Sequence, residues 1–263
     1  MQAQNFRSPI LCIAGLDPSG GAGIQADIET ISACGGHALS IASCLTVQNT
    51  LGASEVVAVE PEFIYRQADN LINDFNILAC KVGVIPNASI AQSIGKILRL
   101  LSGIPVVLDP VLSASRGVPF SDNSTLNAIQ KYVLPYVSII TPNHYEVAAL
   151  SQSDRDEETQ CRTLCSMGPD FVLLTGADNQ TTSVINSLYS SDGAKCSFTW
   201  DRLPNQFHGS GCTLSSAIAY YLTQELSMQV AVEKAQQYTA NTLKHAESLG
   251  KGQWIPNRNI TIK

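Results

Sequence analysis

The sequence predicts an α/β fold in which helices cover both faces of one mostly parallel central sheet. Short apolar runs, rich in Val, Ile and Leu and bounded by turn residues, alternate along the chain with longer amphipathic stretches. A strand, a helix and a strand in succession imply parallel pairing through right-handed crossovers. The predicted buried strands are Ile10–Gly15, Leu39–Val47, Ala79–Gly83, Val106–Asp109, Val137–Thr141 and Phe171–Thr175.

Helical periodicity fills the segments between these strands. The expected helices are Gly23–Cys34, Pro61–Asp74, Ser89–Leu101, Ser121–Tyr132 and Glu157–Met167. After Thr175 the alternation stops, and Ser183–Tyr189 and Lys195–Trp200 are typical of an antiparallel pair. Two further helices, Cys212–Glu225 and Met228–Glu247, follow. No segment has the composition of a linker, so we expect a single domain over residues 1–263.

The composition excludes several classes of protein. Apolar residues make up 44% of the chain and charged residues 14%, which is the opposite of a disordered sequence. With 16 Lys and Arg against 22 Asp and Glu, the net charge is −6, and we expect no partner among nucleic acids or anionic membranes. Apolar runs such as Ile104–Leu108 are too short to span a bilayer. The run Pro9–Leu16 predicts a first strand rather than a signal peptide.

Eight cysteines are scattered through apolar segments and form no C-x-x-C pair, so structural zinc and a disulfide framework are both disfavoured. Buried free thiols are typical of a reducing compartment, so we expect a cytoplasmic protein.

The first strand leads into a glycine-rich turn that contains Gly21-x-Gly23-x-x-Ala26. Between a strand and a helix this pattern is similar to a dinucleotide-binding fingerprint, which also needs an acidic residue about 20 positions on. The stretch Gly36–Thr50 contains no acid, which argues against an NAD-dependent dehydrogenase. A P-loop would need Lys and Ser or Thr after Gly20, and they are absent. A tight strand-to-helix turn is an equally good interpretation.

A second glycine-rich segment, Gly209-Ser210-Gly211-Cys212, opens a predicted helix. Unpaired N–H groups and the helix dipole make such a start an anion hole for a transferring phosphoryl group. A thiol in the first turn is expected to have a lowered pKa, so that it can take a proton from a substrate hydroxyl. The alternative is that Cys212 is simply a small apolar helix residue.

Two further residues suit a divalent metal. Asn143 and Glu146 share a face of a helix that begins near Pro142, and their oxygens suit Mg²⁺, often through water. Ordinary helix capping, with Thr141 as N-cap and Pro142 as the first helical residue, is the competing interpretation. Asp109 ends a strand, so its carboxylate is expected at the ligand edge of the sheet.

Gln48 ends the second predicted strand, and its amide can both donate and accept, which suits a heteroaromatic edge. A solvated loop glutamine is the alternative. His208 is interpreted as a spectator, because four histidines in a chain of this length are unremarkable.

Together these segments resemble the hydroxymethylpyrimidine/phosphomethylpyrimidine kinases of thiamine biosynthesis, a family with the ribokinase-like fold. The motifs that carry the resemblance run in family order across nearly the whole chain. They are Ala14-Gly-Leu-Asp-Pro-Ser-Gly-Gly-Ala-Gly-Ile-Gln-Ala-Asp27, Leu45-Thr-Val-Gln-Asn-Thr50, Lys81-Val-Gly83, Val107-Leu-Asp-Pro-Val111, Thr141-Pro-Asn143 with Glu146, and His208-Gly-Ser-Gly-Cys-Thr-Leu214.

The resemblance implies a role for each matching position. The pyrimidine pocket is expected to be lined by Gly15, Asp27, Gln48, Val84 and Val111, with Gln48 and Asp27 pairing with the ring and its substituents. Cys212 stands where related sugar kinases carry an aspartate base, behind the anion hole of Gly209, Ser210 and Gly211. The implied magnesium and phosphate ligands are Asn143, Glu146 and Asp109.

The chain departs from the family pattern at three places. Thr175-Gly-Ala177 stands where relatives often carry Lys-Gly-Gly, so a phosphate-binding cation is missing. Arg116 replaces a small residue and is a candidate source of that charge. Val84 replaces a methionine of the pocket wall.

The resemblance predicts ATP-dependent phosphorylation of 4-amino-5-hydroxymethyl-2-methylpyrimidine to its monophosphate and then to its diphosphate, with Mg²⁺ and ATP as cofactor and co-substrate. Relatives are commonly dimers, so we expect a homodimer. Two alternatives stay open: a pyridoxine or pyridoxal kinase, whose ring is a similar hydroxymethyl heteroaromatic, and a non-catalytic pyrimidine-binding relative.

Overall fold

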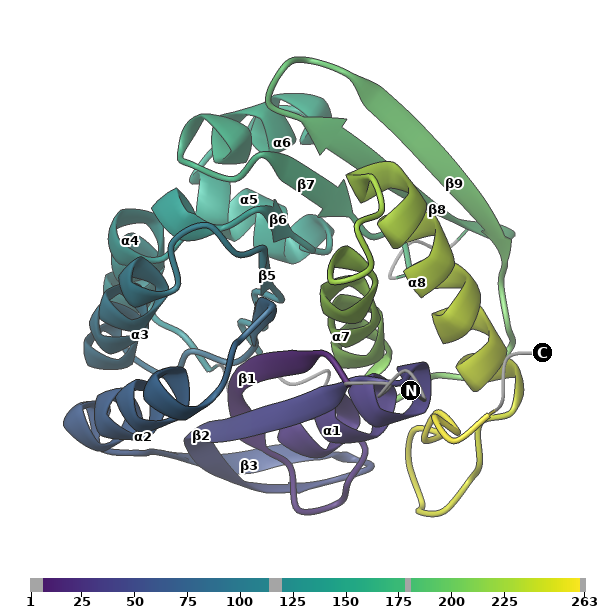
Figure 1. The fold of residues 1–263 in the computed structure, drawn as a ribbon. Helices are drawn as coiled ribbons and strands as arrows, with labels where there is room; N and C mark the ends of the chain where they lie inside the picture. The colour runs from purple at the N-terminus through teal and green to yellow at the C-terminus, as the bar shows by residue number, and fades with distance from the viewer. Residues whose placement is uncertain (1–6, 114–119, 178–180, 261–263) are drawn as a thin grey trace, which may run out of the picture.

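The computed structural model describes residues 7–113, 120–177 and 181–260. Its strands form one nine-stranded sheet in the order β3-β2-β1-β4-β5-β6-β7-β8-β9 (Figure 1). Neighbouring strands from β2 to β7 are parallel, and antiparallel pairs flank them, which confirms the predicted mostly parallel sheet. The strands are β1 (Pro9–Leu16), β2 (His37–Asn49), β3 (Gly52–Ala58), β4 (Ala79–Val82), β5 (Val106–Leu108), β6 (Ile139–Ile140), β7 (Phe171–Leu174), β8 (Ser183–Ser190) and β9 (Lys195–Asp201).

Helices cover both faces of the sheet, as predicted. Figure 1 shows α3 and α4 on one side of β5 and α7 and α8 on the other. Each face buries its own apolar core: one contains Ile94, Leu98 and Leu164, and the other contains Ile31 and Ile218. The helices are α1 (Gly23–Cys34), α2 (Pro61–Asp74), α3 (Ala88–Leu100), α4 (Asn123–Tyr132), α5 (His144–Ser151), α6 (Glu157–Ser166), α7 (Ser210–Leu222) and α8 (Met228–Lys244), with a 3₁₀ turn at Leu134–Tyr136.

The β2–β3 hairpin is the main feature that the sequence does not predict. Strand β2 continues through Gln48 to Asn49, so the prediction that Gln48 ends the strand is wrong. Thr50 and Leu51 then turn the chain into β3, and Gln48 lies opposite Ala53. This turn lacks the Asn-Gly or Asp-Gly pair that marks most two-residue hairpins, so no local signal reveals it.

Within the described residues, no helix has both the length and the apolar character needed to cross a membrane. The cysteines at all eight positions are free thiols.

Helix α3 packs tightly against the end of α4 at Gly95, where any side chain would collide with the backbone carbonyl of Tyr132. We predict that Gly95→Ala lowers the free energy of unfolding by about 1–3 kcal/mol, because the helices must move apart to admit a methyl group. Chemical denaturation measures the change. Gln92→Ala, at an exposed position of the same helix, is the control and should stay within about 0.5 kcal/mol of the wild type. Equal stability of the two variants would contradict the packing argument.

Candidate active site

The predicted site residues lie along the edge of the sheet where the parallel strands end. Gly15 lies near the end of β1, and Gln48 is the second-to-last residue of β2, just before the hairpin turn. Val84, Asp109 and Thr175 directly follow or come soon after β4, β5 and β7. Ligands of open α/β sheets bind outside the carboxyl ends of the strands, so the fold brings these positions to the expected edge.

One end of this edge is apolar. Val84 is buried with Cys44, Ala53 and Phe120, and Val111 packs against this cluster. Gly15 joins it, because a methyl group placed there would lie 3.0 Å from the Cys44 sulfur and 3.6 Å from Val84 Cβ. Three of the predicted pyrimidine-pocket residues, Gly15, Val84 and Val111, therefore share one apolar wall.

Gln48 lies beside this wall and joins a polar network that includes His208. The His208 Nε2 atom lies 2.8 Å from the Asp17 carboxylate and 3.1 Å from the Gln48 amide nitrogen. A carboxylate only accepts, so His208 Nε2 carries the proton that it donates to Asp17. The Gln48 amide oxygen lies on the other side, 3.2 Å from the Thr46 hydroxyl, which donates to the Leu16 carbonyl at 2.9 Å.

The sequence marks His208 as a spectator, whereas the structure buries it beside the predicted ring-recognition residue. Burial tends to raise the pKa of Asp17, but hydrogen bonds from His208 and Ser19 outweigh it and hold that pKa below its usual value. Asp17 is therefore a carboxylate at neutral pH and keeps the network in one arrangement. Close packing of His208 on Gly21, which leaves no room for a side chain there, also ties the histidine to the glycine-rich turn.

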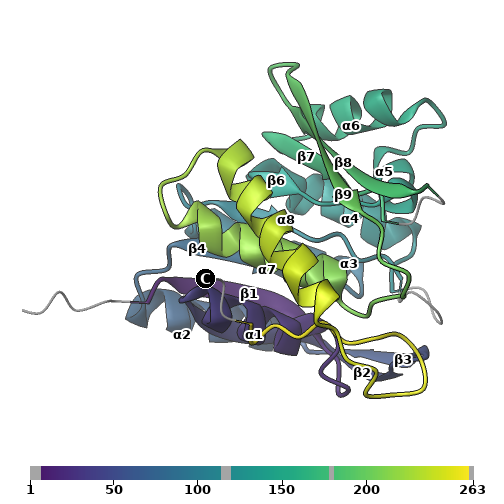
Figure 2. The ribbon, with the colours of Figure 1, turned by 90° about the vertical axis from the view of Figure 1, so that its right-hand side faces the viewer.

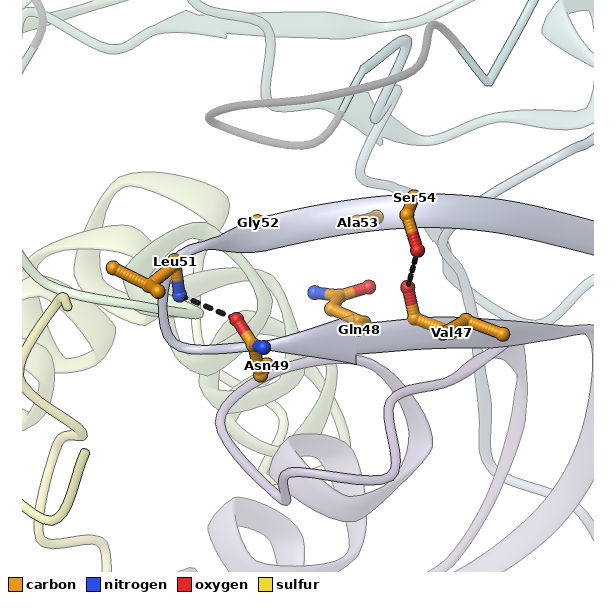
Figure 3. A pocket seen from close by; sticks show the side chains of 7 residues that line it. All are labelled: Val47, Gln48, Asn49, Leu51, Gly52, Ala53 and Ser54. Atoms are coloured by element: carbon orange, nitrogen blue, oxygen red, sulfur yellow. Dashed lines mark hydrogen bonds between the residues drawn. The ribbon is translucent and has the colours of Figure 1, made fainter. Parts of the chain in front are cut away.

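A shallow pocket of about 390 Å³ opens on the hairpin next to Gln48 (Figure 3). Figure 3 shows the Gln48 amide lying between β2 and β3. The lining residues all come from the hairpin: Val47, Gln48, Asn49, Leu51, Gly52, Ala53 and Ser54.

Helix α7 begins at Ser210, two residues before the predicted start, and Gly209 caps it with a φ of +75°. The first backbone bond of the helix runs from Thr213 N to Gly209 O, so the amides of Ser210, Gly211 and Cys212 precede the helical ladder. Gly209 must be glycine for two reasons, since its φ is positive and a side chain would strike the Gly21 carbonyl. The two glycine-rich segments thus touch each other.

A group of buried charges lies beneath the start of α7. Lys81 of β4 and Asp27 of α1, both fully buried, form an ion pair of 2.8 Å, and the Ser216 hydroxyl of α7 donates to Asp27 at 2.7 Å. Asp27 is thus tied to protein groups below the edge of the sheet. Lys81 is not predicted from the sequence as a site residue in its own right, although a lysine within the apolar strand Ala79–Val82 is a signal of a buried, paired charge.

The Cys212 thiol lies close to these charges. Burial raises its pKa to about 12, with Lys81 acting in the opposite direction and Asp109 and Asp27 adding to the increase. The expected lowering of its pKa is therefore wrong, because desolvation outweighs the opposing effects of Lys81 and of a hydrogen bond from the Gly23 amide. Asp109 is also buried, accepts a hydrogen bond from Ser215 at 3.3 Å, and has a raised pKa through burial.

Asn143 and Glu146 form a capping box at the start of α5. The Asn143 side chain accepts from the amides of Tyr145 and Glu146, and the Glu146 carboxylate accepts from the Asn143 amide. The capping interpretation with Thr141 and Pro142 is wrong in position, because the N-cap is Asn143. The bridge between Asn143 and Thr175 joins the ends of β6 and β7 at this point.

Among residues 7–113, 120–177 and 181–260, no three His, Cys, Asp or Glu side chains gather in a way that could hold a metal alone. Mg²⁺ commonly takes one or two carboxylates and completes its shell with substrate phosphates and water, a mode that needs no such cluster. Asp109, which follows β5, and Glu146, in the first turn of α5 after the neighbouring strand β6, fit that mode. Arg116, the proposed replacement cation, lies outside the described residues.

Comparison with known proteins agrees with this geometry. A family model described as phosphomethylpyrimidine kinase matches residues 17–257. The hydroxymethylpyrimidine/phosphomethylpyrimidine kinase of Escherichia coli K12 is 35% identical over 251 residues, which cover 93% of this chain and 94% of the relative. The Arabidopsis thaliana thiamine biosynthetic bifunctional enzyme TH1 is 34% identical over 94% of this chain and 49% of its own length.

Two solved structures are similar in fold. Phosphomethylpyrimidine kinase from Clostridium difficile has a TM-score of 0.78 and 29% identity, with 90% of this chain and 100% of that chain covered. Pyridoxal kinase from Staphylococcus aureus in complex with ADP has a TM-score of 0.87 at 23% identity, with 96% and 94% covered. The second likeness establishes the fold alone. The match over residues 17–257 and the identity to full-length relatives together establish that this chain belongs to the phosphomethylpyrimidine kinase family.

Proposed function

We propose that this protein transfers the terminal phosphoryl group of ATP to 4-amino-5-hydroxymethyl-2-methylpyrimidine and then to the monophosphate, in thiamine biosynthesis. One observation carries the proposal. At one edge of the sheet, an apolar wall and the hydrogen-bonded Gln48 amide lie beside the N-terminus of α7. Family membership and the similarity to the Escherichia coli hydroxymethylpyrimidine/phosphomethylpyrimidine kinase support the same chemistry. The single sheet supports one kinase domain over residues 1–263.

The pyrimidine ring binds against Gly15, Val84 and Val111, and Gln48 reads its polar edge. Because the Gln48 amide contacts His208 on one side and Thr46 on the other, the direction in which it presents its donor and acceptor to the ring is fixed. Asp27 lies beneath the pocket, where its bonds to Lys81 and Ser216 hold β4 and α7 in place. This wall suits a flat, weakly polar ring.

The transferring phosphoryl group is held by the amides of Ser210, Gly211 and Cys212 at the positive end of α7. ATP lies toward β6 and β7, beside Asn143 and Thr175. Mg²⁺, bound mainly by the nucleotide, would be held by Asp109 and, through water, by Glu146, and it neutralises phosphate charge that develops during transfer. Arg116 is the proposed substitute for the lysine that relatives carry at Thr175.

Cys212 receives the proton of the hydroxymethyl group in the first transfer. Burial raises the pKa of this thiol, so the role requires nearby positive charge to favour the thiolate. Lys81 is the described group that favours the thiolate most. The second transfer goes to a phosphate oxygen and needs no strong base.

The test is incubation with ATP, Mg²⁺ and the hydroxymethylpyrimidine, and in parallel with pyridoxine, with the products followed by mass spectrometry. We expect a pyrimidine monophosphate that converts to the diphosphate. Faster turnover of pyridoxine would favour a vitamin B6 kinase. Pyrimidine binding without any turnover would favour a non-catalytic relative.

Replacement of the thiol separates the two steps. We predict that Cys212→Ala slows the first transfer by about 10²–10⁴-fold, the usual contribution of a general base, and slows the second much less. Single-turnover assays with each acceptor measure the two rates. Equal losses in both steps would contradict a base role and leave Cys212 as a wall of the anion hole.

We also propose that the protein is a cytoplasmic homodimer. Its free thiols suit a reducing compartment. Leu16, Leu45 and Val57 are paired neighbours on β1, β2 and β3, and they form an exposed apolar row with fractional exposures of 39%, 48% and 54%. A row of this kind favours association with a second copy.

We predict that Leu45→Lys combined with Val57→Glu converts a dimer into a 28.1 kDa monomer, because charge would be buried between the copies. Light scattering after size-exclusion chromatography measures the mass. Ile185→Lys, at an exposed apolar residue of β8, is the control and should leave the mass unchanged. A wild-type mass of one chain would refute the dimer.

A further inference from the structure

Arg258, which follows the last helix, is among the most buried large side chains of the protein, with only 1% of its surface exposed. A buried guanidinium is costly unless all of its donors are paired. The family motifs found in the sequence end before this residue. We therefore look for the groups that compensate this buried charge.

The guanidinium bonds to each of the segments that frame the proposed anion hole. Arg258 Nε donates to the Thr213 hydroxyl in the first turn of α7 at 2.9 Å. The two terminal nitrogens donate to the carbonyls of Gly20 and Gly21 in the glycine-rich turn. One of them also pairs with Glu29 of α1 at 3.0 Å.

The bond to Thr213 reaches the anion hole directly. The Thr213 hydroxyl that accepts from Arg258 itself donates to the Gly209 carbonyl at 2.9 Å. A methyl group on Gly209 would lie 3.0 Å from the Arg258 nitrogen that bonds Gly21. Arg258 therefore sits behind the point where the two glycine-rich segments meet.

The backbone around Arg258 is held independently of its guanidinium. Its carbonyl accepts from the buried Tyr238 hydroxyl of α8 at 2.8 Å. Upstream, the Trp254 carbonyl accepts from the His208 amide, and the Gln253 amide donates to the Thr50 carbonyl. Figure 2 shows this yellow segment beside the β2–β3 hairpin. The side chain can thus be changed without releasing the segment.

We propose that Arg258 is a positioning residue for phosphoryl transfer, which holds the first turn of α7 in register with the glycine-rich turn so that the amides of residues 210–212 converge on the phosphoryl group. The proposal rests on the proposed anion hole. Only a planar group with donors in several directions can bridge Thr213 and two carbonyls at once, so Lys is a poor substitute. Substrate is not touched, and the pyrimidine pocket lies elsewhere.

The test compares Arg258→Met, Arg258→Lys, Thr213→Val and Thr213→Ser in steady-state assays. We expect the first three to lower kcat by about 10²-fold, the cost of a misplacement near 1 Å, while the KM for the pyrimidine stays within twofold. Thr213→Ser keeps the hydroxyl and should restore most of the activity. Arg258→Met combined with Thr213→Val should lose less activity than the two single losses multiplied together, because both single variants remove the bond between these two side chains.

Normal kcat in Arg258→Met or in Thr213→Val would overturn the proposal. So would a parallel loss of kcat, pyrimidine affinity and thermal stability, since that pattern indicates a structural role only. If Arg258→Met does not fold, the two Thr213 variants decide the matter. Asn259→Ala, at the exposed neighbouring position, is the control.

Gly211→Ala separates this inference from the proposed function. A methyl group there has ordinary contacts, 3.7 Å from the Asp109 carboxylate, so the variant should fold while crowding the anion hole. Full activity of Gly211→Ala would refute the anion hole itself. Loss of activity in Gly211→Ala with normal Arg258 and Thr213 variants would refute only the role of Arg258.

Discussion

The buried ion pair between Lys81 and Asp27 is the constraint on which the arrangement of the site depends. Two charges with no exposure are stabilised only by close mutual contact and further hydrogen bonds. The third partner, Ser216, comes from α7, so the pair fixes β4, α1 and α7 at one point. One oxygen of Asp27 has no hydrogen-bond partner among the described residues, which leaves its negative charge only partly satisfied. The start of α7 and the ends of β4 and α1 that frame the site are therefore positioned by this pair.

That floor supports two different environments side by side. On the β1–β2–β4 side the wall is apolar, and the polar side chain Gln48 beside it is held by His208, which also bonds Asp17. On the side of α7, the backbone amides of residues 210–212 supply hydrogen-bond donors, and Lys81 and Asp27 supply buried charges. The division matches what a kinase for a small aromatic alcohol must do, since it has to bind a ring and stabilise a phosphate within a few ångströms.

Much of this was predictable from the sequence because the relevant signals are local. Apolar runs and helical periodicity predict the sheet and its layers, and turn residues after strands predict the edge that carries Gln48 and Asp109. What was missed depends on contacts between distant segments. The β2–β3 turn has no Asn-Gly or Asp-Gly pair, and the pKa of Cys212 follows from burial that only the folded chain creates. Asp17 lies 191 positions from His208, and Gly20 lies 238 positions from Arg258.

The bonds from Arg258 to Gly20 and Gly21 join residues 238 and 237 positions apart. Contacts of such long range carry a large loop-closure cost and close late in folding, after local helices and neighbouring strands have formed. Segments secured by a few such contacts also open more readily than a sheet core. With Arg258 in the proposed role, catalysis depends on contacts that only the complete tertiary structure makes, so local opening of the segment after α8 would lower activity while the sheet stays folded.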